Sequence, residues 1–211
     1  MRFVTETLPY DGGRMVSIYL PSKLPTAIVF AGDGESVGGW GELLDAAHTP
    51  PTALVGVHGL RDERQRLEEY SPVFNQERFA AHEKFFVDDV RKWARETFDL
   101  DFPVERTAVF GASAGGELSI ALGLRHPDVY GAILSGSPGA GYQPPQSIAG
   151  PIPRTYLVAG IQEPFFLQNA ARWSHALEDA GGEVILAQRD ADHGPALWRG
   201  ELPHMVEWAF A

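Results

Sequence analysis

The sequence predicts an α/β fold with a mostly parallel central sheet of about eight strands flanked by helices. Two of its runs, 26–31 and 52–57, are almost wholly apolar, which is typical of strands buried on both faces. From residue 26 onward such runs alternate with segments of helical periodicity, which favours βαβ units and parallel pairing. The 211 residues contain no low-complexity tract or repeat, so we expect a single domain, residues 1–211.

The chain opens with two alternating segments, 2–8 and 14–20, which the turn at 10–13 is expected to join as a hairpin. Apolar residues recur at helical spacing along one face of a later helix, and His82 shares that face. We therefore interpret His82 as a helix-face histidine and not as a ligand. The elements expected after the hairpin are strand 26–31, a short helix from about 40 to 47, strand 52–57, a polar segment at 61–70 and a long helix at 77–98.

The second half of the chain continues the alternation of strands and helices. The 136–153 stretch is rich in glycine and proline, which predicts a long irregular loop of the kind that borders a site. With the opening hairpin, the count is eight strands, which fits the sheet of an α/β-hydrolase fold. The elements expected here are strand 107–110, a helix up to residue 124, strands 131–134 and 154–159, helix 165–180, strand 183–188 and helix 196–210.

A turn of small residues follows strand 107–110. Gly111-Ala-Ser113-Ala-Gly115 has the Gly-x-Ser-x-Gly form of a nucleophile elbow, a sharp turn from strand to helix. Small residues are needed there because the turn is strained and its backbone packs closely. Ser113 is therefore the predicted nucleophile, and the N–H of Ala114 is predicted to stabilise an oxyanion. The alternative interpretation is a tight turn without chemistry.

A second stretch, Gly34-Glu-Ser36-Val-Gly38, matches the same pattern. Ser36 lies five residues past Ala31, in a glycine-rich loop too loose for an elbow, so it is the weaker candidate. The loop after the third strand is expected to supply the second oxyanion N–H, which we assign to Gly34. Asp33 is a candidate substrate-binding residue, and a turn-forming Asp-Gly is the alternative.

A serine hydroxyl needs a base to take its proton, and the base needs an acid to orient it. On this fold the acid and then the histidine follow the serine along the chain. Of the seven histidines, His175, His193 and His204 come late enough, but His175 and His204 lie within expected helices. His193 follows the last strand in a loop, so it is the predicted base. The alternative is a capping or surface histidine.

The acid is expected just past the penultimate strand, where Glu163 precedes Pro164. A first-turn glutamate favoured by the helix dipole is the alternative interpretation. Asp190 and Asp192 are rival acids. Because they lie so close to His193 in the sequence, we expect them to serve their own loop.

Composition excludes several other functions. The net charge of −11 argues against nucleic acid or an anionic membrane surface as a partner, which leaves a small molecule. The chain has no cysteine, so disulfides and thiolate metal sites are excluded, and serine chemistry requires no metal or organic cofactor. The start lacks an apolar core of signal-peptide length, and no apolar run spans a bilayer, so we expect a cytoplasmic protein. No oligomeric state is predicted.

Three stretches together carry a family resemblance: Gly111–Gly116, Ala159–Pro164 and Asp192–Gly200, the last of which includes Trp198-Arg199-Gly200. With them the chain resembles the enterochelin-esterase-like branch of the putative esterase family, in the α/β-hydrolase superfamily. Esterase D, feruloyl esterases and mycolyltransferases are more distant relatives. The likeness runs from the Gly32 loop to the His193 region.

The resemblance implies that Ser113 is the nucleophile, His193 the base and Glu163 the acid. It also implies that the family's arginine-containing segment corresponds to residues 61–70, which places Arg61, Arg64 or Arg66 near an anionic or polar substrate. A solvated mixed-charge segment is the alternative.

Two departures argue against a ferric trilactone as substrate. Siderophore-cleaving relatives usually carry an additional N-terminal domain that is absent from this sequence. Gly194 follows His193, where a relative often has aspartate. The sequence thus predicts a serine esterase that hydrolyses a carboxylic ester of unspecified structure through an acyl-enzyme. An acyltransferase on the same fold and a catalytically silent, hydrolase-like binding module are the alternatives.

Overall fold

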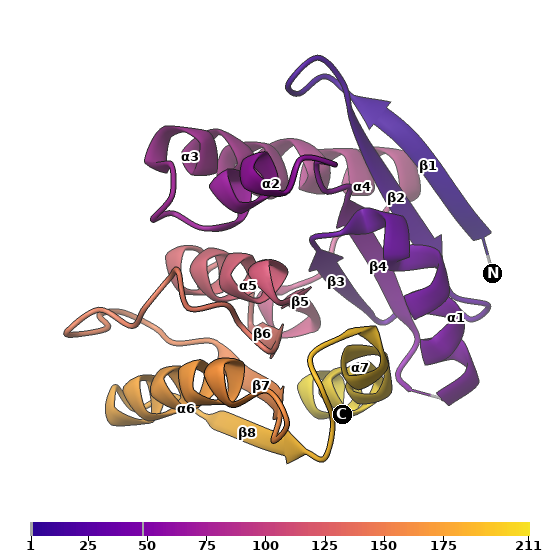
Figure 1. Cartoon of the computed structure of the whole chain (residues 1–211). Coiled ribbons are helices and arrows are strands. Elements are labelled where there is room, and N and C mark those ends of the chain that lie inside the picture. The colour runs from indigo at the N-terminus through magenta and orange to yellow at the C-terminus, as the bar shows by residue number, and fades with distance from the viewer. Residues whose placement is uncertain (1, 48) are drawn as a thin grey trace.

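The computed structural model describes residues 2–47 and 49–211, and its centre is an eight-stranded sheet (Figure 1). The strand order is β1-β2-β4-β3-β5-β6-β7-β8. The strands are β1 (Arg2–Leu8), β2 (Arg14–Leu20), β3 (Ala27–Ala31), β4 (Thr52–Val57), β5 (Thr107–Ala112), β6 (Ala132–Gly136), β7 (Arg154–Gly160) and β8 (Val184–Arg189).

The sheet is parallel except at one edge. There β1 and β2 pair as an antiparallel hairpin with Arg2 opposite Leu20, and β2 pairs antiparallel with β4. All later pairings, from β4·β3 to β7·β8, are parallel. Parallel strands need crossover connections, and helices supply them here. The predicted α/β-hydrolase type of sheet, with the hairpin at its edge, is confirmed.

Helices cover both faces of the sheet, and the core therefore has two layers. Fully buried side chains such as Phe86, Leu118 and Trp173 fill the layer on one face, whereas Leu44 and Met205 belong to the layer on the other. Figure 1 shows α1 and α7 on one side of the sheet and α2, α3, α4, α5 and α6 on the other. The helices are α1 (Val37–Ala47), α2 (Glu63–Tyr70), α3 (Gln76–Lys84), η2 (Phe85–Val90), α4 (Arg91–Phe98), α5 (Ala114–Arg125), α6 (Pro164–Asp179) and α7 (Pro195–Phe210), with short η1 (Gly34–Ser36) and η3 (Val104–Arg106).

The structure differs from the sequence-based expectation in the 61–98 region. The polar segment forms helix α2, because Asp62 caps it: its side chain accepts the N–H of Gln65 at 2.9 Å, and Tyr70 is buried at the other end. The long helix contains the π-helical stretch η2, in which four of six residues, Phe85, Phe86, Val87 and Val90, are buried. The wider turns of η2 keep these side chains against the core.

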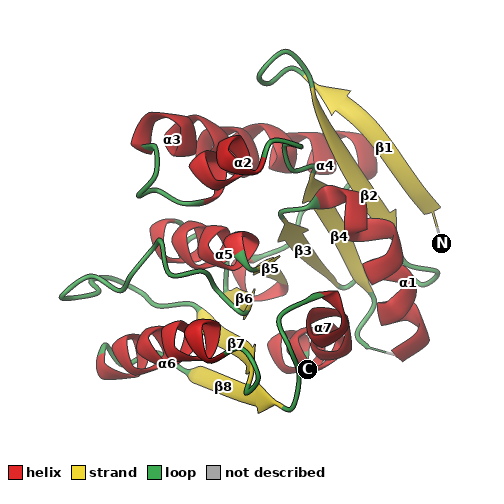
Figure 2. Cartoon of the chain, in the orientation of Figure 1, coloured by secondary structure: helices red, strands yellow, loops and turns green. Residues whose placement is uncertain are grey.

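The loops that follow several strands meet at the carboxyl edge of the sheet. Because parallel strands end at the same edge, the segments after β3, β5, β7 and β8 lie near one another. Figure 2 shows the 137–153 connection, between β6 and β7, as a long loop that passes between α5 and α6 and projects beyond their ends. Within the described residues, no helix combines the length and the apolar character needed to cross a membrane.

Candidate active site

Ser113 occupies a sharp turn between β5 and α5. Its backbone angles are φ 56° and ψ −120°, a conformation that non-glycine residues rarely adopt. The turn is possible because its neighbours are small: a Cβ on Gly111 would lie 1.8 Å from the carbonyl oxygen of Gly115. The Ser113 N–H donates to the carbonyl of Gly136 at 2.9 Å, which ties the turn to the end of β6. This is the backbone geometry that presents a serine hydroxyl at the top of a sheet.

Three side chains from distant parts of the sequence form a hydrogen-bonded series at this turn. The Ser113 hydroxyl lies 3.1 Å from Nε2 of His193, and Nδ1 of His193 is hydrogen-bonded to Oε2 of Glu163. An ionised carboxylate can only accept hydrogen bonds, so Nδ1 of the imidazole carries the proton. Nε2 is then free of a proton and can accept a hydrogen bond from the serine hydroxyl. The structure thus brings together the three residues that the sequence analysis singled out as nucleophile, base and acid.

Glu163 is 5% exposed, and its charge is compensated by several donors. Its Oε1 accepts the Gly160 N–H at 2.6 Å and the Ser137 hydroxyl at 2.5 Å. Ser137 is fully buried, and its hydroxyl in turn accepts Nε1–H of Trp198 at 2.9 Å. The series therefore extends from Trp198 through Ser137 and Glu163 to the imidazole.

Two aromatic rings hold the His193 imidazole in place. The Phe166 ring stacks on it with centroids 3.7 Å apart and an interplanar angle of 19°. The Trp198 ring meets it edge-on at 4.9 Å and 84°. Sequence reasoning missed Ser137 and Phe166. The only signal was positional, because Ser137 directly follows β6 and Phe166 lies in the first turn of α6.

A cavity of about 370 Å³ opens beside Ser113. Its walls combine two tryptophans, two arginines and two carboxylates, and come from the β3–α1 segment, α2, the serine turn and the start of α7. The lining residues are Asp33, Glu35, Ser36, Trp40, Arg66, Ala112, Ser113, Pro195, Trp198 and Arg199. The cavity is large enough for part of a small-molecule ligand.

An ion pair fixes one wall of this cavity. Arg66 donates from Nε and Nη2 to the two oxygens of Asp33, both at 2.8 Å. The buried Tyr70 hydroxyl accepts the Asp33 N–H at 2.9 Å and lies 3.3 Å from its carboxylate. Burial lowers the pKa of the Arg66 guanidinium, but the hydrogen bonds and charge of Asp33 outweigh it and raise that pKa above its ordinary value. Arg66 is therefore charged, and its charge is paired with Asp33.

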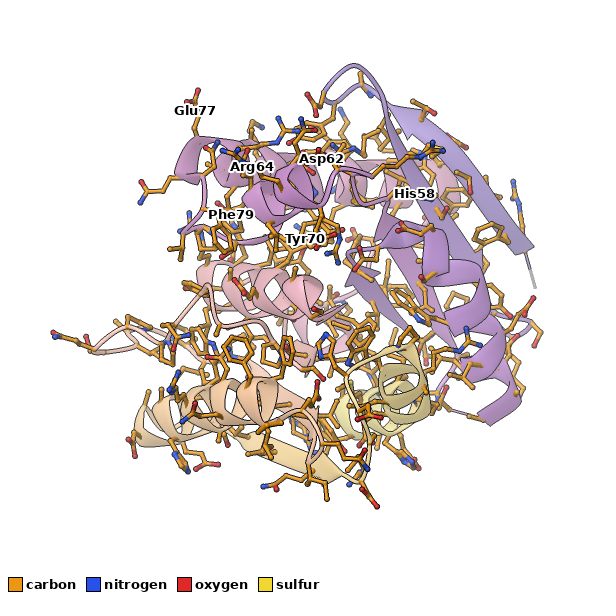
Figure 3. The ribbon with its side chains drawn as sticks, viewed as in Figure 1. His58, Asp62, Arg64, Tyr70, Glu77 and Phe79 are labelled. Carbon is orange, nitrogen blue, oxygen red and sulfur yellow. The ribbon has the colours of Figure 1, made fainter. Side chains whose placement is uncertain are left out.

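The other predicted substrate-binding residues lie farther out. Arg64 is 89% exposed and pairs with Glu68 at 3.3 Å, and Arg61 is also exposed. Figure 3 shows Tyr70 on the side of α2 that faces α5, and Arg64 on its outer side. Within the described chain, the arginines that line the cavity are Arg66 and Arg199. A substrate contact by Arg61 or Arg64 stays a prediction.

The predicted oxyanion donors occupy the two helix starts beside the serine. Ala114 is the first residue of α5, where N–H groups lack partners within the helix. Gly34 is buried at the start of η1, between two residues that line the cavity, and a Cβ there would lie 2.2 Å from the carbonyl oxygen of Gly56. Their role as donors stays a prediction.

The rival residues have other surroundings. Asp190 accepts a hydrogen bond from Gln162 at 2.7 Å, and His175 and His204 are exposed on helices. Ser36 lines the cavity within η1, without a turn like that at Ser113. Within the described residues, no group of three or more histidine, aspartate or glutamate side chains is placed to hold a metal ion.

Solved structures with the same fold include several esterases. The enterobactin esterase FES from Shigella flexneri, in the presence of enterobactin, has a TM-score of 0.83 at 19% identity; the match covers 99% of this chain and 58% of that one. The BES protein from Bacillus cereus has a TM-score of 0.80 at 13% identity, covering 99% and 95%. A ferulic acid esterase from Anaeromyces mucronatus, in complex with ferulic acid, has a TM-score of 0.72 at 15% identity, covering 99% and 90%.

These likenesses show a shared fold, and this chain spans 58% of the length of the Shigella enzyme. A search of curated proteins found no match to the sequence. The family model described as "Putative esterase" matches residues 10–209, which is nearly the full length, and this supports ester hydrolysis. The resemblance noted in the sequence is thereby confirmed, and the chain belongs to the putative esterase family.

Proposed function

We propose that the protein is a serine hydrolase of carboxylic esters, in which Ser113 is the nucleophile, His193 the general base and Glu163 the acid. The observation that carries this proposal is the series of hydrogen bonds from the Ser113 hydroxyl through His193 to Glu163. The strained turn at Ser113 and the adjoining cavity of about 370 Å³ support it.

In the first half of the reaction, the Ser113 oxygen attacks the ester carbonyl carbon while Nε2 of His193 takes the hydroxyl proton. The carbonyl oxygen becomes an oxyanion, which accepts hydrogen bonds from the N–H groups of Ala114 and Gly34. The imidazolium, stabilised by the Glu163 carboxylate, then gives its proton to the leaving alkoxide, and an acyl-enzyme remains.

In the second half, His193 takes a proton from water, and the resulting hydroxide attacks the acyl carbon. The tetrahedral intermediate collapses, the carboxylic acid leaves, and the proton returns to Ser113. Proton transfer by a positioned base contributes about 10²- to 10⁴-fold, and a single oxyanion donor about 10²- to 10³-fold.

Covalent labelling tests this assignment directly. A serine-directed fluorophosphonate is expected to form one adduct, which peptide mass spectrometry finds on Ser113 and not on Ser36. The adduct is expected to disappear in His193→Ala, because the hydroxyl then has no base. A wild-type protein that is neither labelled nor active on aryl, short-acyl and feruloyl esters would show that the scaffold is not an enzyme of this class.

A further inference from the structure

The two arginines of the cavity are in different states. Arg66 is held by both oxygens of Asp33, so its charge is compensated within the protein. Arg199, in the first turns of α7, lines the same cavity. Among residues 2–47 and 49–211 no carboxylate, carbonyl or hydroxyl is hydrogen-bonded or ion-paired to its guanidinium. Within the part of the chain that the structure describes, the cavity therefore contains one cation with a partner, Arg66, and one without, Arg199.

The guanidinium of Arg199 has a defined position against helix α1. Its Nη1 lies 3.1 Å from the point that a Cβ on Gly39 would occupy, and Cζ lies 3.9 Å from that point. Glycine within a helix costs about 1 kcal/mol relative to alanine, yet a side chain here would push the guanidinium away. Gly39 thus leaves room for the charged end of Arg199 beside the cavity wall.

Arg199 is an exposed residue, so its guanidinium is open to solvent as well as to the cavity. Trp40 and Trp198 line the same space. Glu35 is the opposing charge, but its Oε2 accepts the Gly59 N–H at 3.3 Å, and within the described residues it makes no ion pair with Arg199. Despite the net charge of −11, an arginine without a partner among the described residues lines the same cavity as Ser113.

On the basis of the esterase function proposed above, we infer that Arg199 binds a free carboxylate that the substrate carries in addition to its ester group. The planar fork of a guanidinium matches the two oxygens of a carboxylate, and such a bidentate pair is stronger and more directional than one with lysine. The substrate class is then an ester with a second, ionised acid group, on its acyl part or on its alcohol part.

The test compares charged esters with neutral ones of the same shape. Mono-(4-nitrophenyl) glutarate against 4-nitrophenyl pentanoate probes the acyl side, and 3-acetoxybenzoate against its methyl ester probes the alcohol side. In the wild type, the ratio of kcat/KM for charged over neutral ester is expected to exceed one in at least one pair. In Arg199→Gln that ratio is expected to fall by about 10- to 100-fold, the worth of a hydrogen-bonded charge pair.

Three further variants separate recognition from general charge effects. Arg199→Lys keeps the charge without the fork, so an intermediate ratio is expected. Glu35→Gln removes the opposing charge and is expected to raise the ratio by about 2- to 5-fold. Arg95→Gln is the matched control, since it removes an exposed arginine of α4 outside the cavity, and the ratio is expected to stay as in the wild type.

The outcomes are distinguishable. If the wild type hydrolyses none of these esters, the proposed esterase function itself is at fault. If it hydrolyses the neutral esters but shows no preference for the charged ones, or if Arg199→Gln leaves the ratio unchanged, the role assigned to Arg199 is wrong and the esterase proposal stands.

Discussion

Residues 2–47 and 49–211 contain two hydrogen-bonded serine–histidine pairs. Ser17 and His58 lie 2.7 Å apart, which is closer than the 3.1 Å between Ser113 and His193. Ser17 sits within β2, in regular antiparallel pairing opposite Gly56, and is fully buried. Ser113 sits on a strained turn beside a cavity. Of these two serine hydroxyls, only that of Ser113, which makes the longer hydrogen bond, is therefore within reach of a substrate.

The hydrogen-bond networks around the two histidines also differ. Nδ1 of His193 is hydrogen-bonded to Glu163, whereas the network at His58 continues from Ser17 to the hydroxyl of Thr5 at 2.7 Å. Burial lowers the pKa of the His58 imidazole. The negative charge of Glu35 offsets only part of that lowering. The comparison teaches that distance alone does not define a catalytic pair. A catalytic pair is defined by a carboxylate bound to the histidine, a turn that presents the serine and a cavity beside it.

The largest expected difference between the pairs is in catalysis. Ser113→Ala is expected to lower kcat by about 10⁴- to 10⁶-fold, because it removes the nucleophile. Ser17→Ala removes a hydroxyl that is just as close to a histidine, yet kcat is expected to stay within about twofold of the wild type. Hydrolysis of an activated aryl ester measures both. A comparable loss in the two variants would mean that the Ser113 site had been wrongly chosen.

The next largest effect concerns the carboxylate that only one pair has. Glu163→Gln keeps the size of the side chain but presents a neutral amide to Nδ1 of His193. The imidazolium loses its stabilisation and the tautomer is no longer fixed, so kcat is expected to fall by about 10³- to 10⁴-fold. Thermal unfolding checks that the variant is folded. A folded Glu163→Gln protein with near-wild-type kcat would show that Glu163 is not the acid of the Ser113–His193 pair.

A smaller effect is expected from the hydroxyl behind the acid. Ser137→Ala removes the 2.5 Å hydrogen bond to Glu163, while the Gly160 N–H still donates to the same oxygen. Trp198→Phe removes the donor to Ser137 but keeps an aromatic ring against His193. We expect Ser137→Ala to lower kcat by about 10-fold with little change in KM, and Trp198→Phe to lower it by less. An effect on KM alone would assign these residues to substrate binding.

Much of this architecture is readable from the sequence because it depends on local patterns. The all-apolar runs, the small residues around Ser113 and the chain order of serine, acid and histidine indicated the sheet and the three side chains. The hairpin followed from alternation and its Asp11-Gly12 turn. Each of these signals lies within one segment of the chain.

The missed features depend on contacts between segments. Ser137 and Phe166 gain their surroundings only when the segments after β6, β7 and β8 meet. Trp198 was part of the family resemblance, but its hydrogen bond to Ser137 also requires that meeting. The pairing of Arg66 with Asp33 joins residues 33 positions apart, so the sequence left Arg61, Arg64 and Arg66 equivalent. His82 was placed on a helix face, but its full burial and its bond to the Glu69 carbonyl at 3.1 Å required the folded structure.

The smallest expected effect is on stability, and it belongs to the Ser17–His58 pair. Ser17→Ala is expected to cost about 1 kcal/mol of unfolding free energy, because the hydroxyl joins Thr5 to His58. The pH dependence has a defined sign. The folded state lowers the pKa of His58, so below about pH 6.5 the unfolded state binds more protons there, and stability falls as the pH decreases.

His82 acts in the same direction, since burial lowers its pKa to about 4, so the contribution of His58 must be measured as a difference. Urea unfolding of the wild type and of His58→Gln at pH 7.5 and 5.5 provides it. His58→Gln is expected to lose less stability between these two pH values than the wild type, while the activity at pH 7.5 stays within about twofold. An equal loss in both proteins would show that His58 does not titrate as a half-buried, neutral partner of Ser17. A large loss of activity would remove the contrast between the two pairs.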